Sequence, residues 1–213
     1  MNQLKINSWG KTIGYLAWDE SINQSVLELD DEYMNSNFNL SPLLIDKSIR
    51  IHYSGNEEVF YGLHPLFADS LPDYFGNRVF QEWLTQKKYA TTDLNPVDRL
   101  LYIGKRGVGA LEYEPDKTVA KRISKVDFDE LAAISKKITE NKYDYQDFME
   151  NKQALTNILN IGSSVGGAQA KVLVAINDST GEIKAGDVLH KNKNFQYYIV
   201  KLAYESGTTW GKE

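Results

Sequence analysis

The sequence contains no cysteine, which excludes a disulfide framework, a thiol nucleophile and a cysteine-ligated metal site. Only three histidines occur, His52, His64 and His190, and they follow no metal-ligand spacing, so no metal site is expected. No apolar run approaches the length of a membrane span, and no charged-then-apolar segment precedes a cleavage site. These absences predict a soluble cytoplasmic protein without a membrane partner.

A basic tail or stripe is also lacking. The 213 residues carry a formal net charge of −5, which argues against this region as the main nucleic-acid surface. Hydrophobic residues make up 42% of the chain, enough for a substantial core. A chain of this length is expected to form one or two domains.

The first 115 residues predict a small antiparallel sheet with helices. Apolar residues alternate over residues 4–18 around a turn at Gly10, and further strands are expected at 26–29, 49–53, 59–61 and 108–113. Spacings of three and four predict a helix over residues 75–84 that buries Val79, Phe80 and Trp83 in the first domain. A second helix is expected from Pro96 to residue 103, capped by Asn95 and ended by Gly104.

The composition turns polar around residues 114–126, and we place the boundary of the first domain at residue 115. Residues 116–213 predict helices near 127–138 and 145–159, followed by strands at 171–176, 183–185 and 197–202. The expected fold class is α+β. The helix stripes are best explained as simple core packing.

The stretch from Gly162 to Lys171 reads GSSVGGAQAK and lies between the predicted helix and the strand at 171–176. Glycines allow close backbone approach, and consecutive N–H groups in such a loop form an anion-binding nest. The Walker pattern fails because Ala168 and Gln169 follow Gly167, and the GxGxxG patterns fail as well. From spacing alone, a flexible turn is the better interpretation of this stretch than a phosphate loop.

Four segments in order resemble the HipA-like serine/threonine kinase toxins of bacteria. The nucleotide loop of that family reads like Ser-x-x-Gly-Ala-Gln-x-Lys, similar to the segment from Ser164 to Lys171 here. The segment YYIVKL at 197–202 resembles the strand with the ATP-contacting lysine, here Lys201. Residues 67–76 and 101–111 resemble two further family segments. Together these segments extend the resemblance over nearly the whole chain.

The resemblance implies a compact N-terminal subdomain over residues 1–115 and, over residues 116–213, a helical segment with the first strands of a kinase-like N-lobe. It implies an ATP site with Mg²⁺ in the full-length protein, built here from Gly166, Gly167, Ala168, Gln169, Ala170, Lys171 and Lys201. Ser164 takes the position of the serine that the family autophosphorylates to switch itself off, and Ser163 beside it is a second candidate.

The catalytic and metal-binding residues of the family lie downstream of Glu213, so the chain alone is expected to be inactive and to hold no cofactor tightly. The resemblance also implies a HipB-like helix-turn-helix antitoxin that brings the toxin to DNA, and a protein substrate such as an aminoacyl-tRNA synthetase. Two alternatives remain open. In the first alternative, the chain is a non-enzymatic interaction module like a separate antitoxin subunit. In the second, it is a degenerate pseudokinase.

Overall fold

The computed structural model describes residues 3–55, 58–72, 74–86, 94–105, 107, 109–115, 128–139, 171–185 and 194–202. The chain divides into two compact units, each described here by itself. Unit 1 comprises residues 1–71 and 92–118, and unit 2 comprises residues 72–91 and 119–213. The domain boundary predicted at residue 115 stays a prediction.

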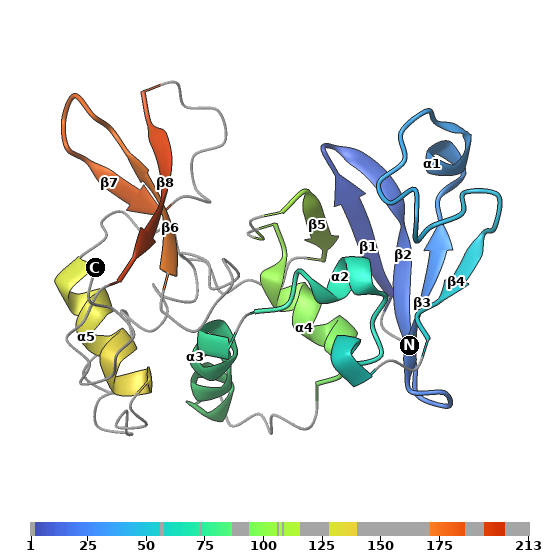
Figure 1. The fold of residues 1–213 in the computed structure, drawn as a ribbon, viewed down its shortest axis with the longest axis horizontal. Helices are drawn as coiled ribbons and strands as arrows, with labels where there is room; N and C mark the ends of the chain where they lie inside the picture. Colours follow the sequence, from blue (N-terminus) through green and yellow to red (C-terminus); the bar gives the residue numbers. More distant parts are fainter. Residues whose placement is uncertain are drawn as a thin grey trace. The chain divides into compact units, whose positions relative to one another are not determined.

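Unit 1 contains a five-stranded antiparallel sheet (Figure 1). Its strands are β1 (Gln3–Ser8), β2 (Lys11–Asp19), β3 (Gln24–Leu29), β4 (Ile51–Tyr53) and β5 (Leu111–Glu114). They lie in the order β4-β3-β2-β1-β5, so the four strands β1 to β4 pair in chain order and β5 returns from far along the chain to pair with β1.

Two glycine-containing sites shape the first hairpin. Trp9 and Gly10 connect β1 to β2 with φ angles of 48° and 75°, the left-handed backbone that a tight two-residue hairpin requires. Gly14 lies where β2 passes close to β3, and a Cβ at this position would stand 2.2 Å from the carbonyl oxygen of Glu28. The hairpin predicted from the alternating pattern is confirmed.

Short helices cover one face of this sheet: α1 (Asp31–Asn35), α2 (Pro65–Ala68) and α4 (Pro96–Ile103). The side chain of Asn95 accepts a hydrogen bond from the backbone N–H of Asp98 at 2.8 Å, and Gly104 ends α4 with a φ of 56°. Both predicted ends of α4 are therefore confirmed. The sequence did not predict α1 or α2.

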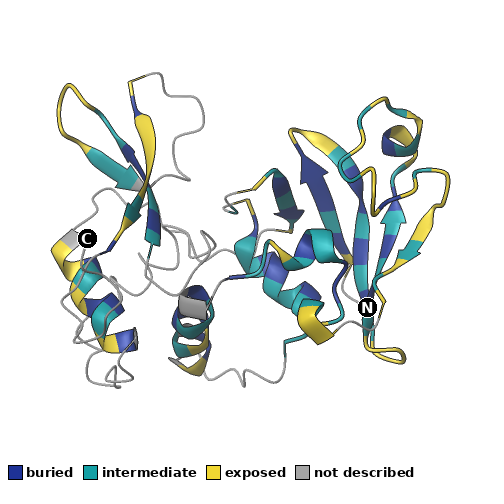
Figure 2. Cartoon of the chain, viewed as in Figure 1, coloured by how far each residue is buried: buried dark blue, intermediate teal, exposed yellow. Residues whose placement is uncertain are grey.

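The core of unit 1 lies between the sheet and these helices. Figure 2 shows the buried residues concentrated along the strands and α4. Alternate strand residues point into this core, and α2 and α4 supply further apolar side chains. Its fully buried members include Leu4, Ile6, Leu16, Leu27, Leu29, Phe67, Leu100 and Tyr113.

Unit 2 contains α3 (Tyr74–Gln86), α5 (Phe128–Thr139) and a three-stranded antiparallel sheet in the order β7-β6-β8. The strands are β6 (Lys171–Ile176), β7 (Ile183–Ala185) and β8 (Gln196–Lys201). Helices α3 and α5 are in contact. Their buried hydrophobic residues are Val79, Phe80 and Leu84 in α3 with Leu131, Ile134 and Ile138 in α5.

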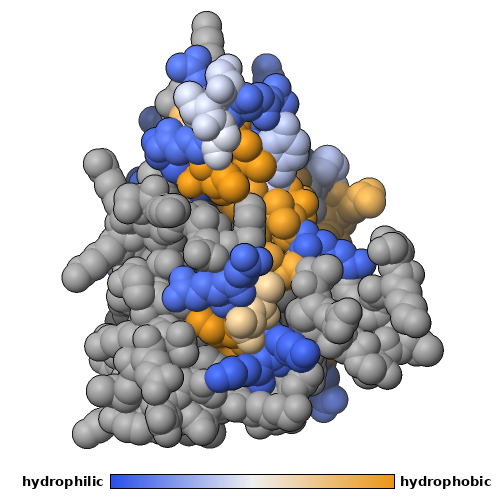
Figure 3. Space-filling view, turned by 90° about the vertical axis from the view of Figure 1, so that its left-hand side faces the viewer, coloured by the Kyte–Doolittle hydropathy of each residue, from blue (hydrophilic) through white to orange (hydrophobic). Residues whose placement is uncertain are grey.

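β8 is an edge strand that exposes apolar side chains on both of its faces. Tyr197 and Ile199 are exposed on one face and Tyr198 on the other. The space-filling view in Figure 3 shows patches of apolar surface among hydrophilic side chains.

The α+β class is confirmed, and one strand prediction is wrong. Residues 59–61 do not form a strand, because Glu58–Phe60 make a 3₁₀ turn (η1) and the φ of Tyr61 is 55°. The helix predicted over 75–84 is present as α3, although its contacts group it with unit 2. The side chain of Trp83 and the helix predicted at 145–159 lie outside the described residues.

Candidate functional site

Two of the predicted site residues, Lys171 and Lys201, lie opposite each other in the sheet of unit 2. Lys171 is the first residue of β6 and Lys201 is the last residue of β8. The antiparallel register pairs them directly. Side chains of directly opposed residues point to the same face, so both ammonium groups leave the sheet on one side, at one end.

The apolar residues between them determine which face this is. Val172 and Val174 are fully buried and alternate with Lys171 along β6. A shift of one residue between the two strands would move Lys201 to the face of the buried valines and leave Lys171 on the other face, so burial of the valines disfavours that register. Lys201 is exposed and Lys171 half-buried, which leaves the lysine face open to solvent at this end.

The paired lysines form a cationic position. Opposed residues in an antiparallel pair have Cβ atoms about 4.5–5.5 Å apart, and like charges directly opposite each other are destabilising. A multivalent anion bound to both ammonium groups would convert this repulsion into attraction. Phosphate oxygens are suitable acceptors for the charge-assisted hydrogen bonds that lysine donates.

The other predicted site residues precede Lys171 in the sequence. Gly166, Gly167, Ala168, Gln169 and Ala170 directly precede Lys171 in the chain, and they lie outside the described residues. The serines predicted as regulatory, Ser163 and Ser164, lie outside them as well. Within the described ranges, no group of three His, Asp or Glu side chains is arranged to hold a metal ion.

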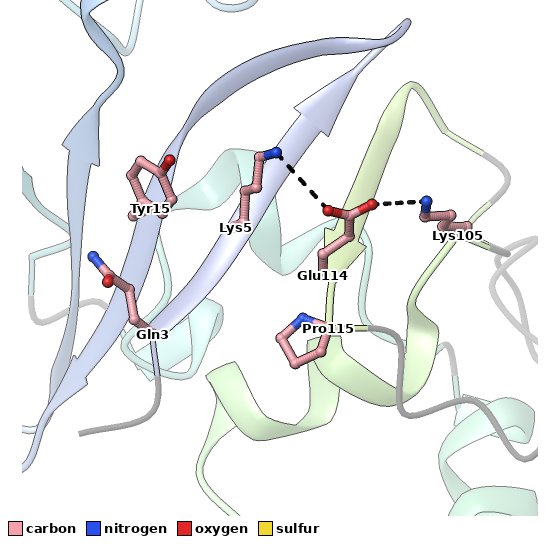
Figure 4. A pocket seen from close by; sticks show the side chains of 6 residues that line it. All are labelled: Gln3, Lys5, Tyr15, Lys105, Glu114 and Pro115. Atoms are coloured by element: carbon pink, nitrogen blue, oxygen red, sulfur yellow. Dashed lines mark ion pairs between the residues drawn. The ribbon is translucent and has the colours of Figure 1, made fainter.

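A second charged cluster lines an open pocket of about 480 Å³ in unit 1, on the sheet face opposite the core (Figure 4). Glu114 accepts contacts from two lysines there. The Nζ of Lys105 lies 2.7 Å from one of its carboxylate oxygens, and the Nζ of Lys5 lies 3.9 Å from the other. Tyr15 is paired with Lys5 across β1 and β2, so the three strands β2, β1 and β5 contribute one row of side chains.

This cluster ties β5 to β1. The hydrogen bond and charge of Lys105 hold the pKa of Glu114 below its usual range, with a smaller contribution from Lys5. All three side chains are about one-third exposed or more, so water screens the interaction. We assign the cluster a structural role. The sequence did not predict it, because Lys5 and Glu114 meet only when distant strands pair.

Another polar group that the sequence did not place is His64, which is buried in unit 1. Its Nδ1 accepts the backbone N–H of Leu66 at 3.4 Å, and its Nε2 lies 3.3 Å from the carbonyl oxygen of Leu44. The two contacts together require the neutral ring with its proton on Nε2. Burial lowers the pKa of His64, so the neutral form is retained. We assign this histidine a structural role as the cap of α2.

Comparison with known proteins gives one match. The family model of the HipA N-terminal domain matches residues 4–114, which is more than half of the chain. A search of curated proteins finds no match. A search of solved structures finds none either. Among the helices that the structure describes, none is long and apolar enough to cross a membrane. The matched segment includes two of the four segments on which the resemblance was based, and the chain belongs to the HipA-like family through its HipA N-terminal domain.

Proposed function

We propose that the chain carries the phosphate-binding half of the nucleotide site of a HipA-like serine/threonine protein kinase toxin from a bacterial toxin–antitoxin system. The observation that supports the proposal is the direct pairing of Lys171 with Lys201 at the end of β6 where the Gly-rich loop enters. A kinase N-lobe requires a glycine-rich loop over the phosphates and a strand lysine on the α- and β-phosphates. Lys201 fills the second role and Lys171 adds a further cation.

The loop residues Gly166 to Ala170 supply backbone N–H groups to the phosphates in this proposal, and the two lysines supply charge. Mg²⁺ would accompany ATP on its phosphates, and we assign no residue of this chain as a metal ligand. Chemistry on a hydroxyl substrate needs a catalytic aspartate and metal ligands, for which we name no residue here.

The proposal extends to regulation and partners. Phosphorylation of Ser164, or of Ser163 beside it, places negative charge inside the loop that binds phosphate and closes the site to ATP. A HipB-like helix-turn-helix antitoxin binds the protein and carries the contact with DNA, and an aminoacyl-tRNA synthetase represents the class of protein substrate. These interactions place the protein in the cytoplasm.

Nucleotide titration of the intact chain tests the site. Removing one phosphate-binding lysine should weaken MgATP binding about tenfold to a hundredfold, the usual range for losing a hydrogen bond from a charged group. Lys171→Met and Lys201→Met should both show this loss. Lys136→Met is the matched control, because Lys136 lies in α5 of the same unit, away from β6 and β8 in the sequence. Equal MgATP affinity in all four proteins would overturn the proposal.

A second candidate is a non-enzymatic interaction module, which the match of the HipA N-terminal domain to residues 4–114 favours. Binding of the antitoxin by this domain without any nucleotide binding by the chain would support that reading, or a degenerate pseudokinase. Nucleotide binding that depends on Lys201 distinguishes the first proposal from both.

A further inference from the structure

The outer edge of β4 is an unpaired strand edge in the described part of unit 1. β4 is the last strand in the sheet order and pairs with β3 alone. The backbone N–H of Leu29 donates to the carbonyl of Arg50 at 2.9 Å, and the N–H of Ser54 donates to the carbonyl of Ser25 at 3.1 Å. Bonding alternates along an antiparallel pair, so residues 50, 52 and 54 face β3. Ile51 and Tyr53 therefore direct their N–H and C=O groups away from the sheet.

The side chains of this edge favour association. Ile51 and Tyr53 lie on one face and are 38% and 63% exposed, values high enough for both to contact another chain. Edge strands are usually protected by a charge, a proline or a bulge. Residues 51–55 contain no charged residue and no proline. Arg50 beside them forms ion pairs with Asp31 and Glu28 of its own unit.

Exposed apolar side chains continue around this strand. Seven of the large hydrophobic residues that the structure exposes fall between residues 43 and 61, namely Leu43, Leu44, Ile49, Ile51, Tyr53, Val59 and Tyr61. The carbonyls of Asp46 and Ile49 contact the His52 ring, which places this part of the 43–49 segment on the face of β4 opposite Ile51 and Tyr53. Apolar groups are therefore available near both faces of the strand.

Side chains and register together indicate a second copy of the chain as the occupant. Residues 51–55 carry no charged side chain, so pairing with an identical edge brings no like charges into contact along this strand. In an antiparallel pairing centred on His52, Ile51 of each copy lies opposite Tyr53 of the other copy. The N–H of each of these residues then donates to the C=O of the residue opposite. Each donor then faces an acceptor and each isoleucine faces a tyrosine, a self-complementary arrangement.

We propose that two copies of this chain associate through β4 in antiparallel register about His52, which joins two five-stranded sheets into one. The proposal does not depend on the nucleotide site, which lies in unit 2. In this register the two His52 residues form a pair whose own backbone groups face away from the new interface. Such pairs have Cα atoms about 4.5 Å apart, within the range that a disulfide bridges. The two Ile51 residues are diagonal neighbours roughly 7–8 Å apart and outside it.

Disulfide trapping tests this register. Because the chain contains no cysteine of its own, every crosslink comes from the introduced cysteine. His52→Cys should form a covalent dimer under mild oxidation, whereas the matched variant Ile51→Cys should not. Equal crosslinking of the two variants would indicate random collision and overturn the register. Circular dichroism should show that both variants are folded, since His52 contributes ring contacts to two carbonyls.

Sedimentation of cysteine-free proteins provides the second measurement. The wild-type chain should approach twice its mass of 24.2 kDa as concentration rises from low to high micromolar. Tyr53→Lys should stay monomeric because it places a charge at the interface, and Trp9→Lys should dimerise like wild type because Trp9 is 74% exposed in the β1–β2 turn. A monomeric wild type, or a dimer that survives Tyr53→Lys, would refute the proposal.

Discussion

Lys171 and Lys201 are directly paired across β6 and β8, with buried Val172 fixing the face on which both ammonium groups lie. An opposed pair of like charges weakens a sheet in the absence of a ligand. A ligand-binding role and a structural role for Lys201 therefore predict opposite effects of its removal on the stability of the unliganded chain.

Lys201→Met should leave the unliganded chain as stable as wild type or stabilise it by roughly 0.2–1 kcal/mol, since it removes the repulsion from Lys171. The same substitution should abolish most of the stabilisation that MgATP confers on wild type. Thermal unfolding with and without MgATP measures both effects. Clear destabilisation of the unliganded variant would assign Lys201 a structural role instead.

Ser164→Asp should weaken MgATP binding, because a negative charge in the loop repels the nucleotide phosphates and competes for Lys171. Ser164→Ala should bind MgATP like wild type. In the proposed kinase toxin it should also lose the off-switch, unless Ser163 is modified in its place. Nucleotide titration and mass spectrometry of the 162–171 peptide measure the two effects. Unchanged affinity in Ser164→Asp would reject the mechanism, and phosphate on Ser163 alone would move it by one residue.

Gly14→Ala should destabilise unit 1 by about 3 kcal/mol or more, because the new Cβ would stand 2.2 Å from a backbone carbonyl of β3 that cannot turn aside. Gly109→Ala is the control, since a Cβ there meets no atom within 4 Å. Chemical denaturation followed by tryptophan fluorescence compares the two variants. Equal denaturation midpoints for the two variants would show that β2 and β3 can move apart at Gly14 with little loss of folding free energy.

The pH dependence of stability should include a contribution from His64. Burial lowers its pKa in the folded chain, whereas the unfolded histidine titrates near about 6.5. The stabilisation is therefore fully present above the unfolded pKa and is lost as the pH falls below it toward the folded value. His64→Asn keeps a residue suited to the helix cap and should flatten the decline in melting temperature between neutral and mildly acidic pH. A decline of the same size in His64→Asn would assign it to other groups.

Glu114→Gln should lower the free energy of unfolding by less than about 1 kcal/mol, since the contacts with Lys105 and Lys5 are partly exposed. The effect should fade when salt is raised from about 0.1 M to about 1 M. The lowered pKa of Glu114 means that its contribution is present above the unfolded pKa and is lost as the pH falls through the folded value. Urea denaturation measures it, with Glu58→Gln as the control from the exposed turn. A loss well above 1 kcal/mol, or one insensitive to salt, would show that the cluster is less screened than its exposure indicates.

The elements that the sequence predicts well are those with local signals. Helix α4 follows from Asn95, Pro96 and Gly104, which act on the adjacent backbone. The short helices α1 and α2 lack the length needed for an apolar period. Residues 59–61 read as a strand because they are apolar and aromatic, but the positive φ of Tyr61 has no signature in a residue type that rarely adopts it.

For the candidate site too, local patterns are visible in the sequence and long-range pairing is not. The alternation of Lys171 with buried valines is visible in the sequence, and so is the alternation in 197–202. The register that brings Lys171 opposite Lys201 depends on pairing between segments separated by a long connection, which no local pattern specifies. The same holds for Lys5 with Glu114, whose strands come from opposite ends of unit 1.

The pairing of β1 with β5 has a consequence for the order of events during synthesis. The ribosome makes residues 3–8 first, yet their second neighbour, residues 111–114, appears only after the segment 72–91 that belongs to unit 2. The nascent chain can form the β1–β2–β3 meander early, while the other edge of β1 waits without its native partner. Closing so distant a contact is slow, and an open strand edge is prone to mispairing in the interval. A chaperone that binds extended apolar segments would find this edge available until residue 114 has emerged.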